Sequence, residues 1–261
     1  MDPISSTQNQ QIKDLLKLSK ARERKTQGLF IIEGLREIKR AKENDYIFQK
    51  VFYCKSLISI PTELFLDKIH ALQKIEVSQN VFSRIAYRDN SDGVLVLAES
   101  KANGLAKLVP KDKGLYLVVE RVEKPGNLGA LLRTVDAAGV DAVIVCDNNM
   151  DLYNPNVIRS SLGCLFTKTV ILADSISTIK FLKKNKVNIF AAALQNSELY
   201  SDADYTQSSA IVMGSEADGL SENWREAADK IIAIPMNGDV DSLNVSVSAA
   251  ILIYEAIRQR T

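Results

Sequence analysis

Histidine and cysteine are scarce in this chain of 261 residues, and their scarcity excludes several kinds of active site. The single histidine, His70, lies in the first half, so the second half can contain neither a Ser-His-Asp triad nor a histidine-ligated metal site. The three cysteines, Cys54, Cys146 and Cys164, are widely spaced among apolar neighbours, which argues against a disulfide framework or a metal knuckle. We expect buried thiols and no metal.

Long apolar runs and the common phosphate-binding motifs are also missing. No segment approaches the roughly 18 consecutive apolar residues of a membrane span, and the polar start MDPISSTQNQ lacks the order of a signal peptide. We therefore expect a cytoplasmic protein with no membrane partner. GxxxxGK[ST] is absent, as is GxGxxG after the first strand of the second half, which disfavours triphosphate hydrolysis and hydride transfer.

The net charge of +1 hides an asymmetry between the two halves. Residues 1–113 carry 20 Lys and Arg against 14 Asp and Glu, whereas residues 114–261 carry 13 against 18. The first 42 residues hold two basic clusters, which comprise Lys13, Lys17, Lys20, Arg22, Arg24 and Lys25, then Arg36, Lys39, Arg40 and Lys42. On charge alone, a polyanionic partner and ordinary solvated helix faces explain these clusters equally well.

The first half has the pattern of a small α/β domain. Short apolar segments predict four strands, at 29–32, 50–53, 74–77 and 93–99. Helical periodicity predicts helices at 11–18, 33–43, 62–72 and 79–85, the last capped by Ser78. The following segment, SKANGLAKLVPKDKG, is polar, lysine-rich and without a clear period. We therefore expect a first domain at 1–100, a linker at 101–113 and a second domain at 114–261.

In the second domain, continuous apolar strands alternate with helices. Strands are predicted at 115–120, 142–146, 169–172, 187–194, 210–213 and 230–234. Helices are predicted at 128–138, 155–162, 176–185, 221–228 and 243–259. This alternation indicates an α/β fold with a mostly parallel sheet covered on both faces. Ligands bind such sheets at the carboxyl ends of the strands.

Three loops at those strand ends are unusually polar: RVEKPGNLGALLRTVDAAG (121–139), GSEADGLSENW (214–224) and the loop within IPMNGDVDSLNVSVSAAILIYE (234–255). They supply asparagines, an arginine, a glutamate, a serine and many backbone amides, but no histidine. Such a set suits a reaction in which a cofactor brings the reactive group and the protein mainly positions the reactants.

PGNLGALLRTVDAAGVDAVIV, IVMGSEADGLS and IPMNGDVDSLNVSVSAAILIYE resemble the three motifs of the SpoU (TrmH) RNA ribose 2′-O-methyltransferases of the SPOUT superfamily. They occur in the family's order and spacing, and the resemblance covers about residues 114–261. LFIIEGLREIKRA resembles, more weakly, the ribosomal-protein-like RNA-binding domain of many members. The resemblance implies a deep C-terminal trefoil knot, a homodimer joined through the final helix, and S-adenosylmethionine as cofactor.

The resemblance also assigns residues. The cofactor would be lined by Gly214, Ile234, Met236, Leu243 and Leu194, and the catalytic positions fall on Asn127, Arg133, Glu216, Ser242 and Asn244. Arg133 would activate the ribose hydroxyl. We favour electrostatic stabilisation of the developing alkoxide, because an arginine base conflicts with a pKa above about 12.

Each assignment has a purely structural alternative. Asn127 could cap a helix, Arg133 could pair with Asp136 or Glu216, Glu216 could sit at a turn, and Ser242 with Asn244 could cap the last helix. The expected substrate is ribosomal RNA. Transfer RNA is the alternative substrate, and a non-catalytic RNA-binding ribosome-assembly factor is the alternative function.

Overall fold

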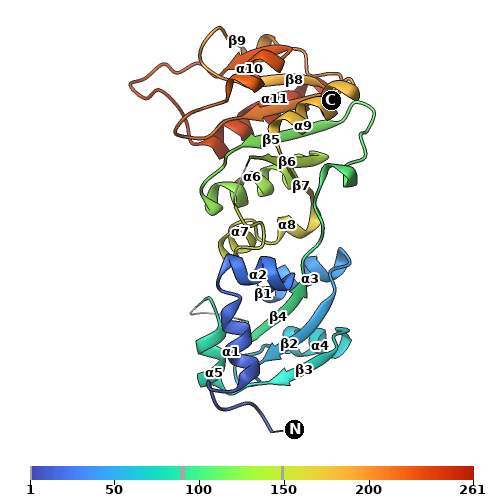
Figure 1. Ribbon diagram of the computed structural model, residues 1–261, viewed down its shortest axis with the longest axis vertical. Helices are drawn as coiled ribbons and strands as arrows, with labels where there is room; N and C mark the ends of the chain where they lie inside the picture. Colours follow the sequence, from blue (N-terminus) through green and yellow to red (C-terminus); the bar gives the residue numbers. More distant parts are fainter. Residues whose placement is uncertain (1, 89–91, 148–149) are drawn as a thin grey trace. The chain divides into compact units, whose positions relative to one another are not determined.

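The computed structural model describes residues 2–88, 92–147 and 150–261 (Figure 1). It divides into two compact units. Unit 1 comprises Met1–Ala102 and Asp151–Thr167, and unit 2 comprises Asn103–Met150 and Lys168–Thr261. The chain therefore passes from one unit to the other three times. Within the described ranges, no helix combines the length and apolar character needed to cross a membrane.

Unit 1 is built on a four-stranded sheet in the order β1-β4-β2-β3. The strands are β1 (Leu29–Glu33), β2 (Phe48–Tyr53), β3 (Gln73–Glu76) and β4 (Val94–Glu99). β4 pairs antiparallel with β1 and β2, whereas β2 and β3 are parallel. All four predicted strands are confirmed.

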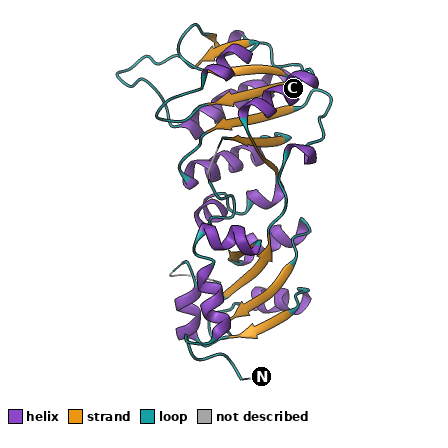
Figure 2. Ribbon diagram, in the orientation of Figure 1, coloured by secondary structure: helices purple, strands orange, loops and turns teal. Residues whose placement is uncertain are grey.

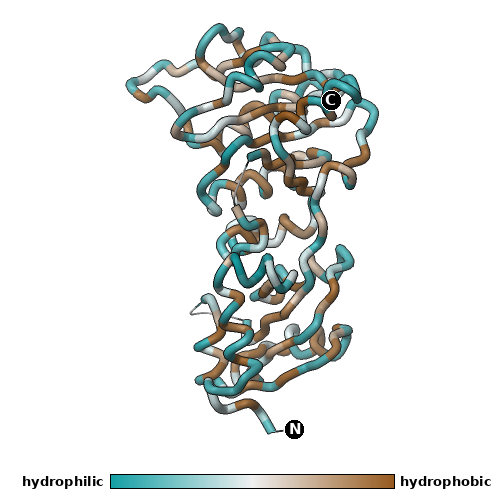
Figure 3. Tube along the Cα trace, in the orientation of Figure 1, coloured by the Kyte–Doolittle hydropathy of each residue, from teal (hydrophilic) through white to brown (hydrophobic). Residues whose placement is uncertain are grey.

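The helices of unit 1 are α1 (Gln10–Lys17), α2 (Ala21–Gln27), α3 (Leu35–Glu43), α4 (Ile60–Lys68), α5 (Gln79–Ile85), α7 (Pro155–Ser160) and α8 (Cys164–Thr167). Ser78 caps α5 as predicted, since its hydroxyl accepts a hydrogen bond from the Val81 N–H. Helices α1 and α5 bury Ile12, Leu15 and Phe82 against the sheet. Figure 3 shows the hydrophobic residues gathered along the strands of this sheet.

The segment Asp151–Thr167 was expected to cover the sheet of the second half, but it packs in unit 1. Its helices α7 and α8 lie against β1 and α3. Aromatic packing explains the placement: the Tyr153 ring stacks on Phe30 with 4.1 Å between centroids, and Phe166 meets Tyr46 edge-on at 5.0 Å. Helical periodicity identifies a buried face but not the surface that buries it.

Unit 2 is a seven-stranded sheet in the order β7-β6-β5-β10-β8-β11-β9, and every described pair is parallel. The strands are β5 (Leu115–Glu120), β6 (Ala142–Cys146), β7 (Thr169–Ala173), β8 (Asn188–Ala192), β9 (Glu198–Leu199), β10 (Ser209–Met213) and β11 (Lys230–Ala233). The predicted parallel α/β fold is confirmed. The two-residue strand β9 is too short to leave a pattern in the sequence.

Helices flank the strands of this sheet (Figure 2). They are α6 (Pro125–Ala137), α9 (Ser175–Lys184), α10 (Glu222–Ala227) and α11 (Val245–Arg260), with 3₁₀ turns at Leu105–Lys107 and Tyr200–Asp202. Leu182 of α9 and Trp224 of α10 pack with Val118 and Val212 in one core. Because side chains alternate along a strand, Leu117 and Ile211 face the opposite side, where α6 and α11 pack together.

The predicted linker is partly structured. Leu108 is buried in the core of unit 2, and the Leu172 N–H donates a hydrogen bond to the Asn103 carbonyl at 2.6 Å. The polar, lysine-rich sequence of this segment gave no indication of these contacts. All three cysteines are buried free thiols, as expected.

Candidate active site

A cavity of about 530 Å³ lies at the carboxyl ends of β8, β10 and β11. All five residues predicted to line a cofactor site also line this cavity: Leu194, Gly214, Ile234, Met236 and Leu243. They come from three separate loops, which only a shared sheet edge brings together. The cavity volume falls within the roughly 300–1,000 Å³ typical of small-molecule sites.

Gly214 sits where a tight turn leaves no room for a side chain. Ser215 and Gly219 exchange backbone hydrogen bonds of 3.2 and 3.1 Å, which close the loop after β10. A Cβ placed on Gly214 would lie 2.2 Å from the Gly219 carbonyl carbon and 2.4 Å from its oxygen. Backbone therefore approaches backbone at the cavity wall, and glycine is required there.

Three predicted catalytic residues are joined by side-chain hydrogen bonds. The Asn127 amide donates to Glu216 Oε1 at 2.6 Å. The Asn244 amide donates to the same oxygen at 3.1 Å and to Asn127 Oδ1 at 3.2 Å. We call this set the Asn-Glu-Asn cluster. It links all three motif loops at the cavity.

The sequence analysis offered a helix cap as the purely structural role of Asn127, and the structure contradicts that role. Helix α6 begins at Pro125, two residues before Asn127, because proline is favoured in the first turn, where its missing N–H costs nothing. Asn127 therefore lies inside the helix with its side chain free to reach Glu216.

Asn244, by contrast, both caps a helix and takes part in the Asn-Glu-Asn cluster. Its Oδ1 accepts hydrogen bonds from the Ser246 N–H at 2.9 Å and the Ser246 hydroxyl at 2.6 Å, so it caps α11. Its amide nitrogen is then directed at Glu216 and Asn127. Because the helix cap orients the amide toward the cluster, Asn244 can be a helix cap and a site residue at the same time.

Glu216 is held as an anion. The Lys124 ammonium hydrogen-bonds its Oε2 at 2.5 Å and lowers the pKa of the carboxyl below its ordinary value, with a further contribution from Asn127. Lys124 was not predicted as a site residue. Its position immediately before Pro125 was the only available signal.

Ser242 lines the cavity, but Arg133 does not. Arg133 is exposed on α6, and its guanidinium forms no hydrogen bond or ion pair within the described part of the chain. The predicted ion-pair alternatives are also not formed: Asp136 pairs with Lys168 at 3.8 Å, and Glu216 pairs with Lys124.

Two further polar side chains that line the cavity were missed in the sequence analysis. Arg225 of α10 donates to Gln195 Oε1 at 3.1 Å, and both residues line the cavity. Gln195 follows the carboxyl end of β8, so the strand-end rule applied to that loop would have found it.

Buried polar contacts beneath the cavity loops hold them to the sheet. Glu120, at the end of β5, accepts hydrogen bonds from the Ser221 N–H at 2.8 Å and the Ser175 hydroxyl at 3.3 Å. The Trp224 indole donates to the same Ser175 oxygen at 2.8 Å. The second motif loop is thus anchored through the start of α10.

Sequence comparison identifies the family of this arrangement. A family model described as the SpoU rRNA Methylase family matches residues 114–254, which is more than half of the chain. The chain belongs to the SpoU family. A second model, described as the MRM3-like substrate binding domain, matches residues 9–96. The family predicted from the three motifs is therefore confirmed.

Relatives in the SpoU family match along almost the whole chain. The chain is 31% identical to the 23S rRNA (guanosine(2553)-2′-O)-methyltransferase RlmP of Bacillus subtilis (strain 168), covering 97% of this chain and 98% of RlmP. It is 33% identical to the 23S rRNA (guanosine-2′-O-)-methyltransferase RlmB of Escherichia coli (strain K12), covering 90% and 98%. The AdoMet-bound rRNA methyltransferase structure from Sinorhizobium meliloti superposes with a TM-score of 0.91 at 27% identity, covering 100% and 98%.

Proposed function

We propose that this SpoU protein transfers a methyl group from S-adenosylmethionine to a ribose 2′-hydroxyl of ribosomal RNA. The observation that carries the proposal is the Asn-Glu-Asn cluster at a cavity lined by all five expected cofactor residues. The named rRNA 2′-O-methyltransferases that match over nine-tenths of the chain favour ribosomal over transfer RNA. Acting on ribosomal RNA, the enzyme would work in the cytoplasm.

The cavity fits S-adenosylmethionine in both size and lining. Ile234, Met236 and Leu243 offer apolar surface, and the turn at Gly214 brings backbone groups to the wall. Gln195 and Arg225 add polar groups suited to the hydroxyls or carboxylate of such a molecule. When bound, S-adenosylmethionine supplies a methyl group made electrophilic by its sulfonium.

The protein's own task is then to orient the ribose hydroxyl and favour loss of its proton. Asn127, Glu216 and Asn244 fix the three motif loops relative to one another, and Ser242 lies in the cavity beside Asn244. Preorganised dipoles of this kind stabilise charge without having to reorganise during the reaction.

Arg133 is proposed to stabilise the developing alkoxide rather than to remove the proton, because its guanidinium stays charged at neutral pH. Its exposed position and lack of partners within the described ranges leave the guanidinium available to RNA. An RNA phosphate can share this cation through paired hydrogen bonds.

We further propose two features that the SpoU motifs imply. The C-terminal part of unit 2 forms a trefoil knot, and two chains form a homodimer joined through α11. Support for the dimer comes from the exposed apolar residues Val247 and Tyr254, which lie seven positions apart on one face of α11. The proposed domains are an RNA-binding domain at 1–100, a linker at 101–113 and a methyltransferase domain at 114–261. The matched ranges 9–96 and 114–254 support this division.

The test is methyl transfer from labelled S-adenosylmethionine to ribosomal RNA, with the products mapped for 2′-O-methylation. Wild type should incorporate label, and Arg133→Ala should lose at least about 100-fold in rate, the size of effect seen for a group that stabilises transition-state charge. Equal rates for the two proteins would refute the role of Arg133. A non-catalytic assembly factor would bind RNA but give no heat with S-adenosylmethionine in calorimetry.

A further inference from the structure

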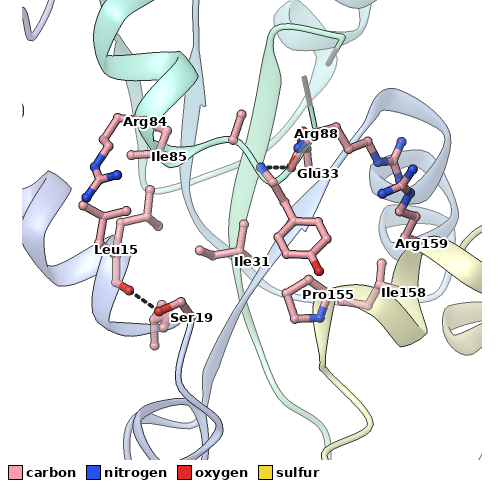
Figure 4. Close-up of a pocket in the computed structure, with 14 residues that line it drawn as sticks. Leu15, Ser19, Ile31, Glu33, Arg84, Ile85, Arg88, Pro155, Ile158 and Arg159 are labelled. Carbon is pink, nitrogen blue, oxygen red and sulfur yellow. Dashed lines mark hydrogen bonds between the residues drawn. The ribbon is translucent and has the colours of Figure 1, made fainter. Parts of the chain in front are cut away.

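Unit 1 contains a pocket of its own, formed entirely by unit 1 residues (Figure 4). Its volume is about 190 Å³. This is below the roughly 300 Å³ at which sites for whole drug-sized ligands begin, so it suits a single ring system. The floor is apolar and consists of Leu15, Leu18, Ile85 and Ile158, all of which are buried.

Three arginines surround this apolar floor. In Figure 4 the side chains of Arg88 and Arg159 extend toward the same edge of the pocket, and Arg84 lies on the opposite side. Arg84 and Arg159 are exposed, and neither guanidinium group forms a hydrogen bond or ion pair with any residue in the described ranges. Two free guanidinium groups beside an apolar pocket are complementary to an anion that carries a flat apolar group.

Tyr87 also lines the pocket, and its ring is 52% exposed. Its backbone N–H donates to Glu33 Oε2 at 2.6 Å, and its hydroxyl donates to Asn156 Oδ1 at 2.9 Å. The residue is therefore held through its backbone and its hydroxyl while remaining accessible. A fixed, exposed aromatic ring is the feature on which nucleic-acid bases stack.

Two buried carboxylates fix the polypeptide around Tyr87. Glu33 also accepts the Arg88 N–H at 3.3 Å, and Glu37 accepts the Arg88 guanidinium at 3.1 Å. Burial alone would raise the pKa of Glu37, but hydrogen bonds from Arg36 and Arg88 outweigh it and hold the pKa below the ordinary value. The pocket edge is thus preorganised by two buried carboxylates whose hydrogen bonds to Tyr87 and Arg88 are already formed.

The basic clusters of the sequence are not all available for binding. Arg24 is buried and pairs with Asp151 at 2.5 Å, and Arg40 donates to the Leu162 carbonyl at 2.9 Å. Arg84 and Arg159 lie outside those clusters, yet among the described residues that line this pocket their guanidinium groups are the unpaired cations.

We propose that this pocket binds one unpaired nucleotide of the RNA substrate, with the base against Tyr87 and the apolar floor and flanking phosphates on Arg84 and Arg159. The proposal rests on the proposed RNA methyltransferase function. A protein side chain is the competing occupant, but the match of residues 9–96 to a substrate binding domain favours RNA. The pocket would make unit 1 select unpaired over duplex RNA.

The test compares two probes on the full chain by fluorescence anisotropy: a labelled, mixed-sequence single-stranded RNA, and the same strand annealed to its complement. Wild type should bind the single strand more tightly. Tyr87→Ala should weaken single-strand binding about 10-fold, the effect of losing one stacked base, and leave duplex binding unchanged. Tyr87→Phe should retain the preference, because it keeps the ring.

Arg159→Ala should weaken single-strand binding and lower the salt dependence by about one counterion, as expected for a phosphate contact. Arg22→Ala is the matched control, since Arg22 is an exposed arginine of unit 1 outside the pocket. An equal loss for Arg22→Ala, or an unchanged preference in Tyr87→Ala, would overturn the proposal. Far-UV circular dichroism during urea unfolding checks that unit 1 of each variant is folded.

The two proposals fail in different ways. If wild type methylates ribosomal RNA but Tyr87→Ala binds both probes as wild type does, only the nucleotide pocket is refuted. If wild type prefers single strands but never transfers a methyl group, the proposed function is refuted and the pocket stands as an RNA-binding site.

Discussion

Glu216 is an exposed carboxylate that three side chains nevertheless hold in place: Lys124, Asn127 and Asn244. The motifs identified Glu216 and the two asparagines, but the hydrogen bonds between residues about 90 and 117 positions apart depend on the fold. Sequence could not reveal Lys124, because lysine before proline has no distinctive pattern. Nor could it show that Arg133 lies outside the cavity lining.

Replacing Glu216 by glutamine should slow methyl transfer about 10- to 100-fold, because misplaced reacting groups cost rates of this order. The amide nitrogen of glutamine can only donate, so it cannot accept the hydrogen bonds that Lys124 or the two asparagines donate to the Glu216 carboxylate. Stability should change by less than about 1 kcal/mol, since the carboxylate is at the surface. Asp218→Asn, in the same loop, is the control, and a Glu216→Gln rate equal to that control would contradict the prediction.

Gly214→Ala should abolish cofactor binding measured by calorimetry and destabilise the protein by about 1–3 kcal/mol, the usual cost of overpacking. The cause is the close approach of the Gly219 backbone to the added Cβ. Gly238→Ala is a matched control, because Gly238 lies in the third motif loop with open space where its Cβ would be. Both measurements should leave Gly238→Ala near wild type.

At the scale of elements, apolar periodicity located most strands and helices but missed α2. Its sequence, ARERKTQ, has no apolar stripe, and its one buried side chain is Arg24. Arg24 donates to the Leu18 and Ser19 carbonyls and pairs with Asp151, so a cation occupies the position where a leucine would be expected. The same ion pair joins α2 to the segment that precedes α7, a long-range contact that sequence periodicity could not reveal.

Arg24→Met should lower the free energy of unfolding of unit 1 by about 3–5 kcal/mol, because it leaves Asp151 without its buried partner. Far-UV circular dichroism during urea unfolding reports both units, whereas fluorescence of the single tryptophan, Trp224, reports unit 2. For Arg24→Met we expect the circular dichroism signal to begin to change at a lower urea concentration, and the tryptophan fluorescence transition to stay where it is in wild type. Lys25→Met, at the exposed neighbouring position, should leave both signals unchanged, and an unchanged Arg24→Met curve would refute the prediction.

At the scale of the whole molecule, the two halves were predicted from charge, strand pattern and the motifs. The exchange of Asp151–Thr167 into unit 1 was not, because sequence order gives no indication that a chain leaves a domain and returns. The proposed dimer and knot were inferred only from the resemblance of the motifs, because strand and helix periodicity carries no information about either.

The proposed homodimer predicts a mass in light scattering of twice the 28.9 kDa chain. Val247→Asp combined with Tyr254→Glu should give the mass of a single chain, because charges would replace the apolar stripe of α11. Ile176→Asp is the control, since Ile176 is an equally exposed apolar residue on α9. A single-chain mass for wild type would refute the dimer.

The return of Asp151–Thr167 to unit 1 also has a consequence for protein synthesis. When the ribosome has made residues 1–102, Phe30 still lacks Tyr153, and Arg24 still lacks Asp151. The ribosome must therefore synthesise all of β5, α6 and β6 before the first unit can be completed. Any exchange of unit 1 between related proteins, in evolution or in the laboratory, would have to transfer two separate stretches of the gene.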